Sequence, residues 1–155
     1  MIKADAVFFD ALCEKSSTSE RKRTIHCFHS TADDRIQRMV NVLEPETYVT
    51  PHKHENPDKR EVFVLLKGSA VVVEFTENGE ISDYFILKFP LQLIAEIAPR
   101  IYHCIIPLEK GTAVYELKDG PYDMADDKNF APWAPFEGDA LCNNYTKKLL
   151  NQLGL

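Results

Sequence analysis

The strongest constraint on the fold is a series of short β-type segments between residues 35 and 118. The turn residues Lys67-Gly68 separate two of them, and Glu77–Glu80 (ENGE) is a strong hairpin signal between two others. The seven segments are rich in β-branched or aromatic residues: RIQRMVNVL, EVFVLL, SAVVVEF, DYFILKF, LQLIAEI, HCIIPL and TAVYELK. Short strands joined by tight turns predict an all-β sandwich or barrel with its core at about residues 35–118.

The N-terminal region predicts a short helix followed by a loop. Residues 4–14 have apolar side chains at the spacing of one helix face, namely Val7, Phe8, Ala11 and Leu12. Residues 15–24 are polar and include the basic run Arg21-Lys22-Arg23. We expect this run to be a solvated loop, and the alternative is a contact with a phosphate or a sugar acid.

The C-terminal region, residues 119–155, differs in composition from the β-rich region. Residues 121–138, called the strap below, contain three prolines among four large aromatic residues: Tyr122, Phe130, Trp133 and Phe136. This composition suits neither a strand nor a helix, so we expect the strap to lie across the barrel. The aromatics either pack it down or shape the rim of a pocket. Residues 143–153 predict a short helix with Asn143 or Asn144 as its N-cap and Gly154 after its end.

Length and charge exclude some classes of protein. The 155 residues suit one domain, and the net charge of −6 lacks the basic face expected of a nucleic-acid-binding protein. No apolar run is long enough to span a membrane or to serve as a signal peptide, so we expect a cytoplasmic protein. The four cysteines form no C-x-x-C pair and are expected to be free thiols: Cys13, Cys27, Cys104 and Cys142.

Three histidines and a glutamate form a candidate metal site. His52 and His54 flank Lys53, so on a strand both imidazoles project to one face and the lysine to the other. Glu61 begins a later strand and His103 begins another. Imidazole nitrogens and a carboxylate that converge in a barrel are suitable ligands for one divalent metal ion, with zinc, iron, nickel and manganese all open. The alternative is a hydrogen-bonded polar cluster at the barrel mouth.

The spacing of these residues resembles the cupin motifs. His52-x-His54, then Glu61, then Gly68 resembles the first motif, and residues 98–103 (APRIYH) resemble the second. The resemblance implies a single cupin domain over residues 1–155, a jelly-roll barrel holding the metal with those three histidines and the glutamate. Tyr102 and Cys104, beside the last ligand, are expected to face away from the metal.

This sequence departs from the cupin motifs at a few positions. Glu46 and Arg100 stand where the two motifs usually have glycine, no asparagine closes the second motif, and the gap before Glu61 is longer than usual. A further resemblance, to the WbuC-type cupin-fold metalloproteins, covers residues 26–54 and parts of residues 116–135. Members of that group often accompany surface-polysaccharide gene clusters, which implies a role in that metabolism.

Three further residues are candidates for contact with a ligand. His29 matches a histidine of the WbuC-type proteins and serves either as an acid, base or second-layer group, or only as a packed side chain. Arg38 either holds an anionic substrate through a bidentate contact or pairs with a surface carboxylate. Tyr48 is expected to line the cavity.

A metal with open positions in a cavity allows three classes of function. The first is a Lewis-acid enzyme, such as an isomerase, epimerase or lyase, acting on a small oxygenated metabolite such as a sugar or sugar nucleotide. The second is an iron-dependent dioxygenase, and the third is a non-catalytic module that binds a small ligand. The expected partner is a small molecule rather than nucleic acid or membrane, and an exposed edge strand leaves a homodimer open.

Overall fold

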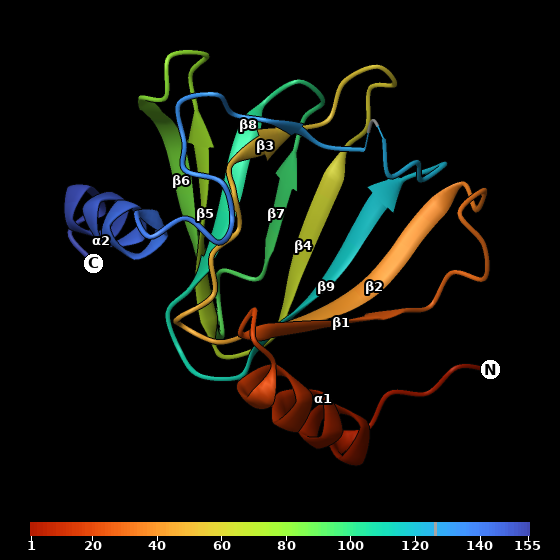
Figure 1. Cartoon of the computed structure of the whole chain (residues 1–155). Helices are drawn as coiled ribbons and strands as arrows, with labels where there is room; N and C mark the ends of the chain where they lie inside the picture. The colour runs from red at the N-terminus through yellow and green to blue at the C-terminus, as the bar shows by residue number, and fades with distance from the viewer. Residues whose placement is uncertain (126) are drawn as a thin grey trace.

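The computed structural model describes residues 1–125 and 127–155, so position 126 of the strap lies outside the description. Within this part of the chain, two five-stranded antiparallel sheets face each other (Figure 1). The first sheet has the order β1 (Arg23–Cys27), β2 (Ile36–Leu43), β9 (Thr112–Asp119), β4 (Glu61–Lys67) and β7 (Ile94–Ile97). The second has the order β10 (Asn129–Phe130), β3 (His52–Lys53), β8 (Tyr102–Pro107), β5 (Ser69–Phe75) and β6 (Ile81–Lys88). The predicted all-β, jelly-roll architecture is confirmed.

Three layers of buried apolar side chains hold the sheets and helices together. The central layer lies between the sheets and includes Phe63, Leu87 and Val114. A second layer, including Leu12, joins helix α1 (Ala6–Thr18) to the outside of the first sheet. A third, including Leu149, joins helix α2 (Cys142–Leu153) and the strap to the outside of the second sheet. Figure 1 shows the two helices on opposite sides of the sandwich, with the strap crossing between β9 and α2.

The seven predicted strands correspond to β2 and β4 to β9, and the departures lie near the ends of the chain. The first helix extends into the expected polar loop as far as Thr18, and Val7, predicted on its apolar face, is 76% exposed. The loop prediction also missed β1, which pairs with β2 over its whole length. The strap contributes the short strand β10.

The C-terminal helix begins without the predicted asparagine cap. Leu141 occupies the N-cap position without a side-chain hydrogen bond, and the carboxylate of Asp139 instead accepts the Leu141 N–H at 2.8 Å. The predicted end is confirmed, because Gly154 adopts the left-handed conformation that closes a helix. No helix in the two described ranges combines the length and apolar character needed to cross a bilayer.

We predict that Leu87→Ala destabilises the protein by about 2–5 kcal/mol, because it leaves a cavity in the central layer, where Leu87 is fully buried. Leu91→Ala is the matched control, since Leu91 is 88% exposed and its truncation should change stability by less than about 0.5 kcal/mol. Urea unfolding followed by circular dichroism measures both, and equal stabilities of the two variants would contradict this account of the core.

Candidate metal centre

The four predicted ligands meet at one end of the sandwich. Strand β3 pairs with β8 so that His52 lies directly opposite His103, and His54 follows β3 by one residue. Glu61 begins β4 in the facing sheet. All four side chains are buried, and one potential ligand atom from each lies within 4.8 Å of the others. The sandwich therefore brings together residues that are up to 51 positions apart in the chain.

Strand alternation explains why these side chains, and not their neighbours, reach the centre. Lys53 points the other way, as predicted: its ammonium pairs with Glu77 at 3.0 Å and lies over the Tyr102 ring. Tyr102 and Cys104 likewise face away from the centre, as predicted, in the apolar layer beneath the strap.

The hydrogen bonds of the three imidazoles define which ring nitrogen carries the proton. Nδ1 of His52 lies 2.9 Å from the Thr50 carbonyl oxygen, and Nδ1 of His103 lies 2.9 Å from that of Ile101. Nδ1 of His54 contacts the carbonyl oxygen of Asp127. Because a carbonyl can only accept, each Nδ1 carries a hydrogen, and in a neutral ring Nε2 keeps a lone pair.

These lone pairs face a carboxylate, which is unfavourable unless a positive charge lies between them. Oε2 of Glu61 is 2.7 Å from Nε2 of His103 and 3.1 Å from Nε2 of His54. Nε2 of His52 is buried and has no hydrogen-bond partner among the described residues. Protonating His54 and His103 would relieve that repulsion but would leave His52, whose pKa burial lowers well below its usual value, without a partner among the described residues. A divalent cation satisfies all four atoms at once, so the residues fit a metal ion.

The ionisation state of Glu61 also suits a metal ligand. Burial alone would raise the pKa of Glu61, but positive charge facing it, whether a proton held by His103 and His54 or a bound cation, holds it well below its usual range. Glu61 therefore stays ionised and can act as an anionic ligand at neutral pH.

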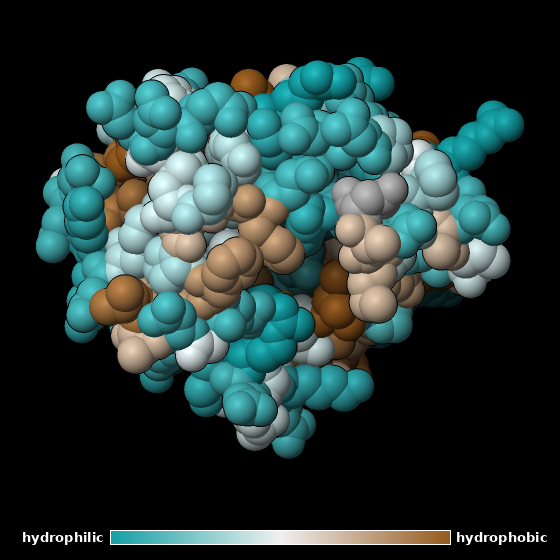
Figure 2. Space-filling model, turned by 45° about the horizontal axis from the view of Figure 1, so that its top comes forward, coloured by the Kyte–Doolittle hydropathy of each residue, from teal (hydrophilic) through white to brown (hydrophobic). Residues whose placement is uncertain are grey.

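A cavity of about 820 Å³ opens beside the four-residue cluster, between the two sheets. His52, Glu61 and His103 form part of its wall, and Phe63 and Val114 form an apolar floor continuous with the central layer. Figure 2 turns this end of the sandwich toward the viewer and shows apolar side chains near the centre of a largely hydrophilic face. The cavity is large enough for a small metabolite.

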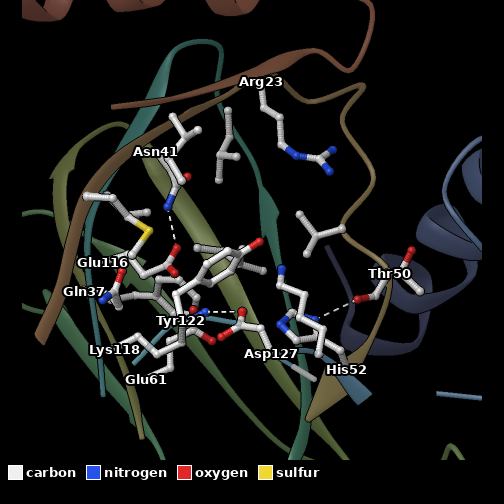
Figure 3. A pocket seen from close by; sticks show the side chains of 18 of the residues that line it. Arg23, Gln37, Asn41, Thr50, His52, Glu61, Glu116, Lys118, Tyr122 and Asp127 are labelled. Atoms are coloured by element: carbon white, nitrogen blue, oxygen red, sulfur yellow. Dashed lines mark hydrogen bonds and ion pairs between the residues drawn. The ribbon is translucent and has the colours of Figure 1, made fainter. Parts of the chain in front are cut away.

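Polar side chains from β2 and β9 face the cluster across the cavity (Figure 3). Asn41 donates through Nδ2 to the carboxylate of Glu116. Burial raises the pKa of Glu116 well above its usual value, and the nearby negative charge of Glu61 raises it further. Lys118, two residues along β9, pairs with Asp127 of the strap at 2.5 Å.

The sequence interpretation missed this polar wall, although β9 contained a signal for part of it. Glu116 and Lys118 alternate with apolar residues in a strand that is otherwise core-forming, the pattern of a charged inner face. Asp127 lies in an irregular segment without periodicity, so nothing in the sequence indicated its position.

Of the three further candidates for ligand contact, one lines the cavity and two lie elsewhere. His29 lines the cavity, and its Nδ1 accepts the backbone N–H of Arg38 at 3.1 Å. Arg38 and Tyr48 are not among the described residues that line the cavity. The guanidinium of Arg38 donates to the Phe28 carbonyl at 3.1 Å and lies 3.7 Å from Asp34, on the α1-facing side of β2.

The predicted cavity position of Tyr48 is also corrected. Its hydroxyl donates to the Pro135 carbonyl at 2.8 Å, and its ring packs against Tyr145 of α2. Tyr48 therefore fastens the strap to the barrel from outside. For Arg38 the physical reason is alternation, because Asn41 and Met39 of β2 point into the cavity and Arg38 shares the opposite face with Val40.

Comparison with known proteins identifies the family. A family model described as a domain of unknown function, DUF6016, matches residues 4–87, more than half of the chain. The chain belongs to the DUF6016 family. No curated protein matches it by sequence.

Solved structures similar to this DUF6016 chain have the cupin fold. CapF, a capsular polysaccharide assembling protein from Staphylococcus aureus, superposes with a TM-score of 0.61 and 22% identity over 73% of this chain and 31% of CapF. Protein SO0799 from Shewanella oneidensis gives 0.56 and 11% over 80% of both chains. A cupin superfamily protein from Desulfitobacterium hafniense gives 0.51 and 14% over 70% of this chain and 86% of its own.

The similarity to these solved structures concerns the fold. They establish the cupin fold that the motifs predicted, and the closer resemblance to WbuC-type proteins stays a prediction. The DUF6016 chain spans about a third of the length of CapF, so a likeness to CapF concerns only that part of the larger protein.

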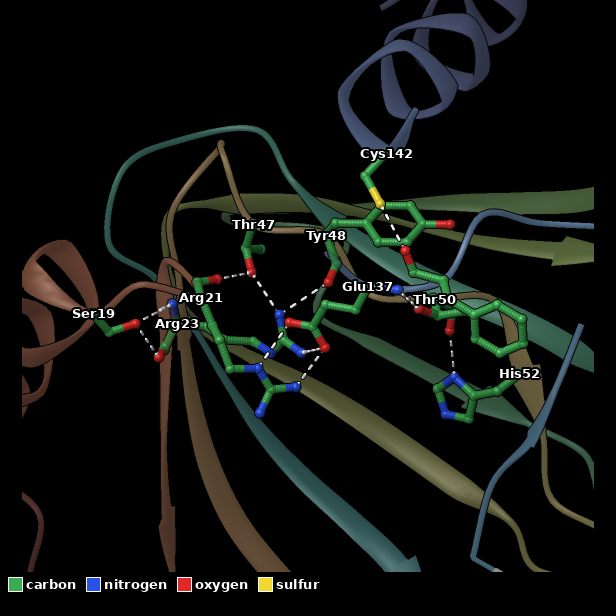
Figure 4. A network of polar contacts seen from close by, with 10 residues as sticks. Ser19, Arg21, Arg23, Thr47, Tyr48, Thr50, His52, Glu137 and Cys142 are labelled. Atoms are coloured by element: carbon green, nitrogen blue, oxygen red, sulfur yellow. Dashed lines mark hydrogen bonds and ion pairs between the residues drawn. The ribbon is translucent and has the colours of Figure 1, made fainter. Parts of the chain in front are cut away.

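The two arginines of the basic run, Arg21 and Arg23, bind the strap, which corrects the expectation of a solvated loop (Figure 4). Arg21 and Arg23 contact the same Glu137 carboxylate at 2.6 and 2.7 Å. The backbone N–H of Glu137 donates to Thr50 Oγ1 at 3.1 Å, and the carbonyl of Thr50 is the partner of His52. Partial burial alone would raise the pKa of Glu137, but the two guanidinium groups hold it at about 2.

We predict that Glu137→Gln lowers the free energy of unfolding at pH 7, because it removes the carboxylate shared by Arg21 and Arg23. The folded pKa of Glu137 lies below its ordinary value of 4.5, so between these values the unfolded chain binds more protons. The stabilisation is therefore complete above about pH 4.5 and is lost as the pH falls toward about 2.

The difference between wild type and Glu137→Gln should accordingly shrink in acid, as measured by urea unfolding at a series of pH values. Glu80→Gln, at an exposed turn, is the matched control. A difference for Glu137→Gln that is constant from pH 7 to pH 3 would rule out the ion pairs as its source.

Proposed function

We propose that this chain is a metal-binding cupin that uses its metal as a Lewis acid on a small oxygenated metabolite, such as a sugar or sugar nucleotide. The observation that carries the proposal is Nε2 of buried His52, which has no partner in the described part of the chain and is directed at the same point as Nε2 of His54 and His103 and the Glu61 carboxylate. A buried acceptor without a donor is costly, and a metal ion removes the cost.

The proposed ligand set would leave room for a substrate. Three imidazoles and one carboxylate provide four donors, and zinc, iron, nickel or manganese can bind one or two more. A bound divalent ion would supply polarisation of a carbonyl or hydroxyl oxygen. His54 lies behind the cavity wall formed by His52, Glu61 and His103, so the open side of the cluster is the cavity side.

The chain's own residues would bind and orient the metabolite. Asn41 and Glu116 offer hydrogen-bonding groups to hydroxyls across the cavity, and Lys128 lines it near His52. Phe63 and Val114 exclude water from the floor. Such a mixture of apolar floor and few polar walls suits a compact molecule with several oxygens.

His29 is the candidate acid or base of the proposed reaction. It lines the cavity, and its Nδ1 is engaged by the Arg38 N–H, which leaves Nε2 as the nitrogen able to exchange a proton with a ligand. The aromatic residues Tyr122 and Phe130 of the strap also line the cavity, where a ring face can stack on a sugar.

A link to surface polysaccharides rests on the WbuC-type resemblance and on the description of CapF as a capsular polysaccharide assembling protein. Both favour a sugar derivative over other oxygenated metabolites. The cytoplasmic location and the homodimer expected from the sequence stay predictions.

We predict that the protein, purified without added metal, contains about one divalent ion per chain, and that His54→Ala loses most of it while keeping a folded barrel. His26→Ala is the matched control, because His26 lies on the exposed edge strand β1 away from the cluster. Elemental analysis by mass spectrometry gives the metal content, and circular dichroism reports the fold. Full metal retention in His54→Ala would disprove the ligand assignment.

The identity of the metal separates the proposed reaction from its alternatives. Zinc, nickel or manganese together with a bound sugar-like molecule supports the Lewis-acid enzyme. Iron with substrate-dependent oxygen uptake would replace it with the dioxygenase. A bound ligand that is released chemically unchanged would replace it with a binding module.

A further inference from the structure

The strap lies along the segment of residues 52–54, which carries two of the four clustered side chains. Strand β10 of the strap pairs with β3 so that Phe130 lies opposite His52. Ala131 N–H donates to the Pro51 carbonyl at 2.9 Å, and the Asn129 side chain donates to the Glu55 carbonyl at 3.0 Å. Strand β3 is therefore held between β8 on one side and the strap on the other, and without the strap it would be a two-residue edge.

Asp127 makes the most direct contact between the strap and the cluster. Its carbonyl oxygen accepts the Nδ1 hydrogen of His54. The other two histidines use the carbonyls of residues two positions before them in the chain, Thr50 and Ile101. His54 alone is oriented by a residue 73 positions away, so its geometry depends on where the strap is held.

The side chain of Asp127 fixes that position. Its two carboxylate oxygens bind two buried lysines, Lys59 at 3.0 Å and Lys118 at 2.5 Å, and all three side chains are at most 4% exposed. Lys59 also donates to the Pro121 carbonyl at 2.5 Å. Burying three charged groups is expensive and succeeds only with close, well-aligned contacts, so the carboxylate has little freedom to move.

Both lysines lie close to Glu61, one along the chain and one across the sheet. Lys59 precedes Glu61 by two residues, and Lys118 is the residue paired with Glu61 across the β4–β9 ladder. Asp127 thus joins the segment that carries Glu61 to the ring of His54. One residue of the strap therefore contacts His54, which follows β3 of the second sheet, and the two lysines near Glu61, which begins β4 of the first.

We propose that Asp127 is a positioning residue of the metal site, holding His54 in the Nδ1–H form with Nε2 directed at the metal. Its carbonyl makes the contact, and the clamp of Lys59 and Lys118 on its carboxylate keeps the carbonyl in place. This proposal rests on the metal binding proposed above. Groups that orient a ligating histidine in this way typically contribute about 10- to 100-fold to metal affinity.

The test compares Zn²⁺ affinity, measured by competition with a chromophoric chelator, among four proteins. Asp127→Asn and Lys59→Met weaken the clamp from the strap side and from the barrel side. Asp123→Asn is the matched control: the same change in the same segment, at a carboxylate that accepts only the Ala125 N–H among its described contacts. We expect about 10- to 100-fold weaker binding for the first two and wild-type binding for the control.

Two spectroscopic readouts separate positioning from a general loss of structure. The visible absorption of the Co²⁺-loaded protein reports ligand geometry, and it should change in Asp127→Asn and not in Asp123→Asn. In the metal-free protein, ¹⁵N chemical shifts of the His54 ring report its tautomer, which should be Nδ1–H in the wild type and mixed in Asp127→Asn. The second readout needs no metal and also applies to a variant of reduced stability.

The outcomes distinguish the two proposals. A wild-type protein that binds no Zn²⁺ or Co²⁺ overturns the metal site itself. A wild type that binds metal, beside folded Asp127→Asn and Lys59→Met proteins with unchanged affinity, Co²⁺ spectrum and His54 tautomer, overturns the role of Asp127 alone. If Asp127→Asn does not fold, unchanged affinity and tautomer in Lys59→Met overturn it equally.

Discussion

The arrangement of the site depends on one electrostatic constraint: three imidazole lone pairs and a carboxylate are directed at the same buried point. Each ring donates from Nδ1 to a backbone carbonyl, and so each presents Nε2 to the cluster. In water such an arrangement would simply be solvated, but here the Nε2 of His52 has no partner among the described residues. A fold that holds these buried acceptors together favours the binding of a cation between them, and the proposed function is therefore built on a metal ion.

The two sheets of the sandwich each supply part of the cluster. The second sheet presents His52 opposite His103, and the first presents Glu61 from the beginning of β4. The apolar central layer keeps the sheets apart at a fixed spacing and ends at the cavity floor. The strap then closes the open side of β3. Two polar residues of the strap connect it to the histidines. The Asp127 carbonyl accepts the His54 Nδ1 hydrogen, and the Glu137 N–H donates to Thr50, whose carbonyl accepts the His52 Nδ1 hydrogen.

Much of this could be predicted from the sequence, because strand periodicity is a local property. The alternation His52-Lys53-His54 was enough to place two imidazoles on one face, and cupin spacing supplied Glu61 and His103. The failures concern contacts between distant segments. Arg38 sits on a strand whose two faces are both covered, one by α1 and one by the cavity wall, and periodicity alone does not say which face is which. Tyr48 follows β2 in an irregular loop, where side-chain direction has no period.

The sequence by itself determined the class of fold and the identity of the four clustered residues. Only the tertiary structure decided that the His52 Nε2 has no partner within residues 1–125 and 127–155, that Glu116 and Asn41 face the cluster, and that Asp127 reaches His54. The reason is physical: strand pairing and side-chain alternation are encoded over a few residues. The partner of a buried polar atom is instead decided by whichever distant segment the packed sheets bring within hydrogen-bonding distance.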